Sequence, residues 1–137
     1  MSKKYDKIRA AINFWVDLIK PEMQKELDAM PDGRRKTEKI KEFENNIKTF
    51  RGNLGEFIDL NMPQWKFDFF QLTCVGTPLF HLRAAMENAK IDPSYLNGKL
   101  IDMEITNKNV IVYNRKTNTK KVLYDDRRGE RNQDRQK

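Results

Sequence analysis

The sequence predicts an α+β fold, with an N-terminal helical part of about three to five helices followed by a C-terminal three-stranded antiparallel meander and a disordered tail. Two changes of pattern lead to this prediction. Over most of the first 90 residues, apolar side chains recur at steps of three and four, which places them on one face of a helix. After Lys99 they alternate at every second position, which is typical of half-buried strands.

The first predicted helix ends near Lys20, where a proline interrupts the pattern. Its apolar stripe consists of Tyr5, Ile8, Ile12, Trp15 and Ile19. Pro21 cannot continue a helix, but it suits the first turn of a new one. We therefore expect a short second helix, which carries Met23, Leu27 and Met30 and ends at the "PDG" break.

The longest predicted helix begins near Arg34, and Gly52 and Gly55 weaken its end. Its apolar positions are Ile40, Phe43, Ile47, Phe50, Leu54 and Phe57. This stripe fits antiparallel packing against the first helix. The alternative is a seam between two copies of the chain, although fewer clean heptads are present than a coiled coil requires. The expected oligomeric state is thus a monomer, or a dimer through the helical part.

The segment "QWKFDFFQLTC" has two interpretations. Trp65, Phe67 and Phe69 alternate with polar residues as in a strand, whereas Pro63 suits the start of a helix that packs Phe69, Phe70 and Leu72 inward. We favour a helix, because a strand here would need partners about 30 residues away along the chain. A further helix is predicted from Thr77, as N-cap, with Pro78 at its first position, to about Lys90.

Three strands and a tail complete the predicted chain. The first strand carries Ile101, Met103 and Ile105, the second spans Val110 to Asn114, and the third spans Lys121 to Tyr124. Residues 126–137 contain no aliphatic or aromatic side chain, so burial cannot offset the entropy of ordering them. The prediction is one domain over residues 1–125 and a disordered charged tail over 126–137.

Net charge and composition limit the classes of binding partner and the cellular location that we expect. The net charge is +7, and residues 99–137 hold eleven Lys or Arg against six Asp or Glu. A basic surface attracts nucleic acid, anionic membranes or acidic proteins. No apolar stretch is long enough to span a bilayer, and the lone Cys74 excludes an internal disulfide. We expect a cytoplasmic protein that does not associate with membranes.

The basic hairpin formed by the second and third predicted strands is the main candidate site. Its predicted nucleic-acid-binding residues are Lys108, Arg115, Lys116, Lys120, Lys121, Tyr113 and Tyr124. We expect the five cations to lie within one small surface region, where they would contact phosphates, while the two tyrosines would stack on unpaired bases. The alternative is a solvated edge hairpin whose lysines prevent aggregation.

No pattern in the sequence supports catalysis or a cofactor. His81 lacks further ligands for zinc and a local carboxylate for general-base catalysis. The acidic pairs Asp125–Asp126 and Asp102–Glu104 are typical of solvated turns and strands, and we predict no metal site. The aromatic group Trp65, Phe67, Phe69 and Phe70 is expected in the core; if exposed, it would indicate a protein-binding patch.

The function predicted from these features is that of a small basic non-enzymatic accessory protein, which associates with nucleic acid or with a nucleic-acid-processing complex mainly through the basic hairpin. The alternative is a protein-binding inhibitor or adaptor that acts on a larger cytosolic host machine through an apolar or aromatic patch. Size and charge are typical of the accessory proteins of phages and mobile elements.

Overall fold

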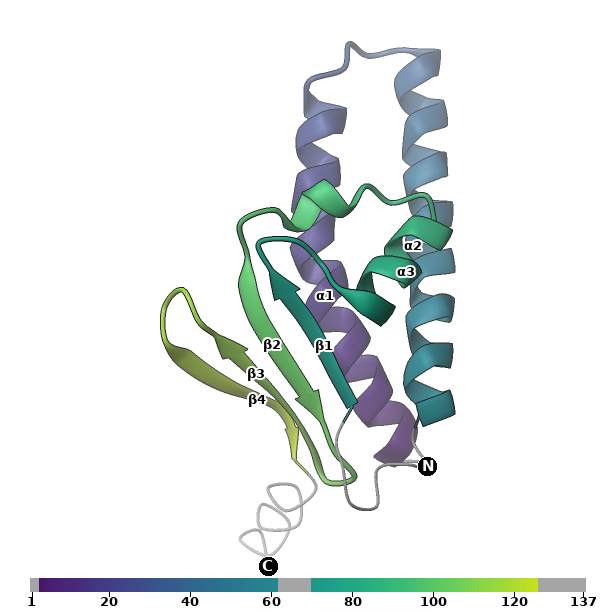
Figure 1. Ribbon diagram of the computed structural model, residues 1–137. Coiled ribbons are helices and arrows are strands. Elements are labelled where there is room, and N and C mark those ends of the chain that lie inside the picture. The colour runs from purple at the N-terminus through teal and green to yellow at the C-terminus, as the bar shows by residue number, and fades with distance from the viewer. Residues whose placement is uncertain (1–2, 62–69, 126–137) are drawn as a thin grey trace, which may run out of the picture.

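Helices cover one face of a four-stranded antiparallel sheet (Figure 1), in a computed structural model that describes residues 3–61 and 70–125. The helices are α1 (Lys3–Asp28), α2 (Arg34–Asn61), α3 (Phe80–Asn88) and the short 3-10 helix η2 (Pro93–Leu96). The strands are β1 (Phe70–Val75), β2 (Leu100–Ile105), β3 (Asn109–Asn114) and β4 (Thr119–Asp125). The α+β class is confirmed, with four strands in place of three. None of the described helices is both long enough and apolar enough to cross a membrane.

The predicted break at Pro21 is wrong, because α1 continues through it to Asp28. The stripe of the first predicted helix runs on without a change of phase, and Ile19, Met23 and Leu27 are all buried. Packing of this continuous stripe compensates for the hydrogen bond that a proline removes from a helix interior.

Pro21→Ala is therefore expected to stabilise the protein by about 1–3 kcal/mol, because alanine restores a backbone donor at an exposed helical position. Chemical denaturation measures the change, with Pro31→Ala, beyond the end of α1, as the control. A loss of stability in the Pro21 variant would show that α1 requires the proline.

The antiparallel packing of α1 on α2 is confirmed, and it explains one of the two glycines in α2. A Cβ atom at Gly55 would meet Ile12 Cδ1 at 3.4 Å and Ile8 Cγ2 at 3.8 Å, whereas one at Gly52 would meet nothing. Gly55 thus lies where the two helices approach closely, and α2 remains helical through both positions.

The helix favoured for residues up to Leu72 is wrong from Phe70 onward. These residues belong to β1, which pairs antiparallel with β2. Along β1, the buried residues Phe70, Leu72 and Cys74 alternate with neighbours that are less buried. The partner strand does lie about 30 residues away in sequence, and α3 and η2 occupy the connection. Trp65, Phe67 and Phe69 lie outside the described residues.

The start of α3 also differs from the prediction. The helix begins at Phe80, its N-cap is Leu79, and no side chain caps it. Thr77 Oγ1 instead accepts a hydrogen bond from Arg83 Nη1 at 3.0 Å, and Pro78 forms an isolated bridge with Cys74. This turn leads the chain from the sheet edge to the helical layer.

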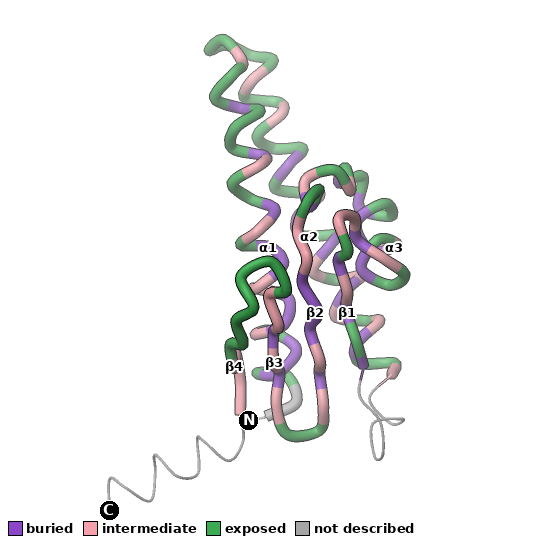
Figure 2. Tube along the Cα trace, turned by 60° about the vertical axis from the view of Figure 1, so that its left-hand side comes forward, coloured by how far each residue is buried: buried purple, intermediate pink, exposed green. Residues whose placement is uncertain are grey.

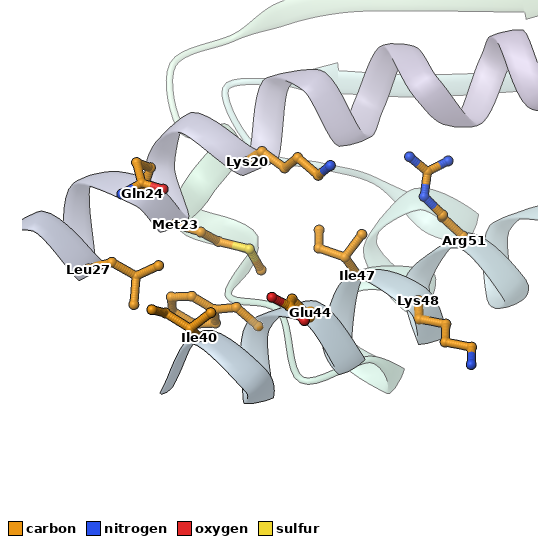
Figure 3. Close-up of a pocket in the computed structure, with 10 residues that line it drawn as sticks. Lys20, Met23, Gln24, Leu27, Ile40, Glu44, Ile47, Lys48 and Arg51 are labelled. Atoms are coloured by element: carbon orange, nitrogen blue, oxygen red, sulfur yellow. The ribbon is translucent and has the colours of Figure 1, made fainter. Parts of the chain in front are cut away.

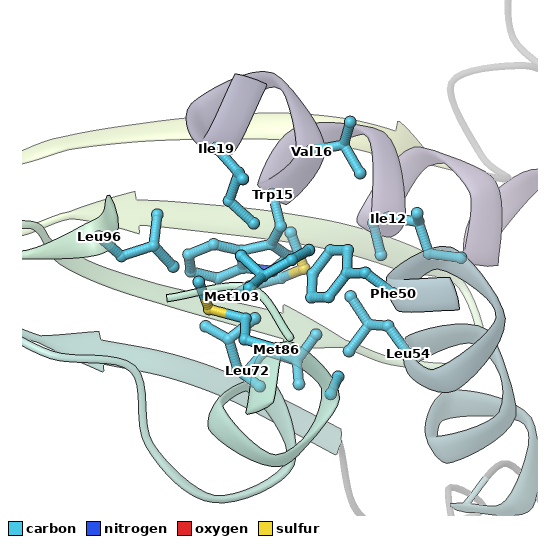
Figure 4. Packing of buried hydrophobic residues seen from close by; sticks show 14 of the residues in the cluster. Ile12, Trp15, Val16, Ile19, Phe50, Leu54, Leu72, Met86, Leu96 and Met103 are labelled. Carbon is cyan, nitrogen blue, oxygen red and sulfur yellow. The ribbon is translucent and has the colours of Figure 1, made fainter. Parts of the chain in front are cut away.

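The three predicted C-terminal strands are confirmed as β2, β3 and β4, which pair in sequence order. Their apolar alternation faces the helices, and Ile101, Met103 and Val112 join Trp15 and Phe50 in one core cluster. Figure 4 shows Trp15 and Met103 close together between α1 and the sheet.

Candidate nucleic-acid interface

The predicted basic hairpin exists, and its register determines which way its lysines point. Lys120 pairs with Tyr113, and Lys121 pairs with Val112, whose side chain is buried under the helices. Because side chains alternate along a strand, Lys120 projects from the open face of the sheet and Lys121 from the helical side. The hairpin therefore presents cations on both faces of its end, where residues 115–121 are exposed (Figure 2).

Local hydrogen bonds hold the tip of this hairpin. The Asn114 side chain accepts hydrogen bonds from the backbone N–H groups of Lys116 at 3.1 Å and Thr117 at 3.2 Å. Asn118 adopts a positive φ of 55°, a conformation that asparagine tolerates well. The turn thus fixes the backbone that carries Lys116 and Lys120.

The prediction that Lys108 lies near the other cations is wrong. It is in the turn between β2 and β3, at the end of β3 opposite to the hairpin tip. The buried Lys7 side chain of α1 donates a hydrogen bond to the neighbouring carbonyl of Asn107. The length of one strand therefore separates Lys108 from the tip, about 20 Å for six residues.

Arg115 is at the tip but already has a partner. Its Nε donates to a carboxylate oxygen of Asp102, and its backbone N–H donates to the carbonyl of Leu100 at 2.8 Å. The side chain of Asp102 is 7% exposed and that of Arg115 is 67% exposed. Arg115 thus neutralises a buried carboxylate on the open face of the sheet.

The two partners of this ion pair should respond differently to mutation. Arg115→Ala is expected to destabilise the fold by about 1–3 kcal/mol, because it leaves the buried Asp102 carboxylate without its partner. Asp102→Asn should cost less than about 1 kcal/mol, since the exposed arginine can return to water. Urea unfolding of both variants tests the asymmetry, and equal losses would contradict it.

The two tyrosines do not form a shared stacking surface. Tyr113 lies on the open face, and its hydroxyl donates a hydrogen bond to Glu104 Oε2 at 3.4 Å. Burial, followed by the negative charge of Glu104 and this hydrogen bond, raises the pKa of Tyr113. Tyr124 pairs with the buried Val110 and packs against the core from the other side.

Sequence reasoning missed Lys99, which precedes β2 and lies beside the hairpin tip. Lys99 and Lys116 line a cleft of about 230 Å³, together with Asn97, Gly98 and Asn114. A second cleft, of about 220 Å³, lies between Tyr113, Arg115 and Lys120. Lys99 and Lys116 lie close together because β2 and β3 are antiparallel, so the start of β2 is beside the end of β3. We call Lys99, Lys116, Lys120 and Lys121 the basic hairpin end.

The other residues considered for chemistry have structural surroundings. The His81 ring contacts the rings of Phe57 and Phe70 at centroid distances of 5.2 and 5.1 Å. Cys74 is buried, and its thiol hydrogen-bonds to the carbonyl of Leu96 at 3.3 Å. Burial raises the pKa of this thiol, and Lys99 opposes the rise. Residues 3–61 and 70–125 contain no group of three or more His, Cys, Asp or Glu suited to a metal ion.

Comparisons with known proteins identify the fold. No protein-family model matches the sequence, and no curated protein matches it. A solved variant of the BTG/Tob domain of C. elegans FOG-3 is similar in structure, with a TM-score of 0.58 over 88% of this chain and 90% of that one. The two sequences are 13% identical. The chain therefore has a fold similar to that of a BTG/Tob domain.

Proposed function

We propose that this protein is a small basic non-enzymatic accessory protein that associates with nucleic acid, or with a nucleic-acid-processing complex, through the basic hairpin end. One observation carries the proposal: Lys99 and Lys116, from different segments, meet at one polar cleft, with Lys120 and Lys121 beside them on the same hairpin. In the described part of the chain, none of these four lysines is ion-paired with an acid. Their charges are therefore available to phosphates.

Some of the predicted site residues remain available to phosphates, whereas others are too distant or already have a partner. Lys116, Lys120 and Lys121 remain the proposed phosphate contacts, and Lys99 joins them. Lys108 is too distant from the other cations to contact the same short stretch of nucleic-acid backbone. Arg115 is already paired with the Asp102 carboxylate. Tyr113 is the one tyrosine on the open face beside Lys120, where its ring edge can border a bound strand.

Four phosphate contacts set the expected strength and salt dependence. Each neutralised phosphate contributes about 0.7–0.9 to the slope of log affinity against log salt, so the total is about 2.8–3.6. This slope weakens binding by about 50- to 150-fold between 50 and 200 mM salt. Lysines act as point charges without the planar fork that reads guanine, so sequence preference should be slight.

Fluorescence anisotropy with a labelled single strand of about 20 mixed-sequence nucleotides tests the proposal. We expect binding at low salt with the slope given above, and similar affinities for two strands of unrelated sequence. Absence of binding at about 50 mM salt, or affinity that does not change with salt, would contradict association through phosphates.

A protein-binding inhibitor or adaptor is the second candidate function. The aromatic patch expected for it lies mainly outside the described residues, and Phe70, the described member, is buried in β1. A different feature favours protein binding: an open apolar groove between α1 and α2.

A further inference from the structure

The outer halves of α1 and α2 extend beyond the sheet as a helical hairpin (Figure 1), and a groove runs between them. Its volume is about 440 Å³, and every described residue that lines it belongs to one of these two helices. Its apolar lining consists of Met23, Leu27, Ile40, Phe43 and Ile47. Ile40 remains 37% exposed. The volume lies within the range of pockets that bind ligands, about 300–1,000 Å³.

The rest of the described fold leaves this groove uncovered. Helix α3 meets α2 along a different stripe, where Asn53 Nδ2 donates to the carbonyl of Ala85 at 3.4 Å. No residue of the sheet, α3 or η2 lines the groove. Met23, Leu27, Phe43 and Ile47 are themselves buried between the two helices, so Ile40 is the apolar lining residue that water reaches most. A partner's apolar side chain that covers Ile40 would remove this surface from water.

The charges around the groove are unequal. Figure 3 shows Lys20 and Arg51 pointing toward one another on the side of the groove away from Leu27, whereas Lys48 points outward from α2. Glu44 is the single acid among the described lining residues. Asn13 Oδ1 holds Arg51 Nη1 at 2.8 Å, and neither Lys20 nor Lys48 is ion-paired within the described chain. The groove therefore combines an apolar floor with a net positive end.

This charge pattern selects among the occupants of the groove. A second copy placed on the groove would bring together two chains that each carry a net charge of +7. Residues 126–137 contain no aliphatic or aromatic side chain that would cover an apolar floor. An acidic amphipathic segment can pack its apolar side chains on the floor and place its carboxylates near the basic end.

We propose that the α1–α2 groove docks an acidic amphipathic helix of a partner protein, with its apolar stripe on the floor and its carboxylates beside Lys20 and Lys48. This inference rests on the second candidate function, and it names the chemistry of the partner. It does not depend on the basic hairpin end, whose lysines lie outside the groove.

Two synthetic peptides test the docking. One is a fluorescein-labelled helix of about 15 residues, roughly four turns, with Leu at steps of three and four and Glu at most other positions. In the matched peptide, Lys replaces every Glu. We expect wild-type protein to bind the Glu peptide at least about tenfold more tightly than the Lys peptide, because charge complementarity fixes the partner.

Variants then locate the site. Lys20→Glu with Lys48→Glu should weaken binding of the Glu peptide at least about tenfold, and Ile40→Asp should weaken binding of both peptides. Lys41→Glu with Lys90→Glu makes the same change in net charge at exposed positions outside the groove, and should leave binding within about threefold of wild type.

Three outcomes would overturn the proposal. The first is that the Glu peptide fails to bind the wild type. The second is that it binds the Lys20/Lys48 variant as tightly as the wild type. The third is that sedimentation shows a wild-type dimer that Ile40→Asp dissociates, with no peptide bound, which would assign the groove to a second copy. Oligonucleotide binding, measured on the same samples, reports separately on the hairpin.

Discussion

Trp15→Ala is expected to lower the free energy of unfolding by about 3–5 kcal/mol, the largest stability effect we predict for a single substitution. Trp15 is fully buried between α1 and the sheet (Figure 4), and Phe14 packs its ring edge-on at a centroid distance of 5.2 Å. Alanine would leave a large cavity at the centre of the core. Since domains of this size are typically stable by about 5–15 kcal/mol, the variant should melt far below the wild type.

Trp15→Phe separates the loss of volume from the loss of the indole N–H. In the described part of the chain, Trp15 Nε1 is buried without a hydrogen-bond partner. Phenylalanine removes this unpaired donor, whose burial costs about 1–3 kcal/mol, so its net effect should be much smaller than that of alanine.

The control for these core variants is Phe80→Ala, which removes a ring that is 82% exposed. Its stability should stay within about 0.5 kcal/mol of wild type. Urea unfolding followed by circular dichroism measures all three proteins. A Trp15→Ala variant as stable as Phe80→Ala would contradict the described core.

Reversing all four charges of the basic hairpin end should weaken oligonucleotide binding by at least about 100-fold at 50 mM salt. In the variant, Lys99, Lys116, Lys120 and Lys121 become Glu, so four attractive contacts with phosphate become repulsive. The fold should survive, because Lys116, Lys120 and Lys121 are exposed and Lys99 is only partly buried. Circular dichroism checks this.

A matched variant distinguishes a local site from a general effect of net charge. In this variant, four exposed cations outside the hairpin become Glu: Arg9, Lys41, Lys48 and Lys90. The change in net charge from +7 is the same as in the hairpin variant. We expect this variant to bind at least about tenfold more tightly than the hairpin variant. Equal losses in the two variants would show diffuse attraction to the whole protein.

Local pattern predicted the meander well, because strands close in sequence are paired through short turns. The turns around Lys108 and Asn118 are flanked by β-branched and aromatic runs, and both connect antiparallel neighbours. Pro21 misled the prediction because local propensity was weighed above the phase of the apolar stripe. The four-residue steps from Ile19 to Met23 and Leu27 already indicated one helix.

Features that depend on distant pairing could not be predicted in the same way. Strand β1, predicted as a helix, buries Phe70, Leu72 and Cys74 at alternate positions, but its partner β2 follows only after α3. The register between β2 and β3 places Lys99 beside the hairpin tip and Lys108 at the opposite end of β3. The Asp102–Arg115 pair likewise arises between strands, so sequence spacing alone did not indicate that Arg115 was occupied.

An NMR titration of the ¹⁵N-labelled protein with the mixed-sequence oligonucleotide tests the central claim most directly, because it locates the contact. The proposed interface predicts that the largest amide shifts occur in residues 97–99 and 114–121, that they diminish as salt is raised, and that α1 and α2 change little. Shifts centred on the α1–α2 hairpin, or around Lys108, with the amides of Lys116 and Lys120 unmoved, would contradict the basic hairpin end as the binding site.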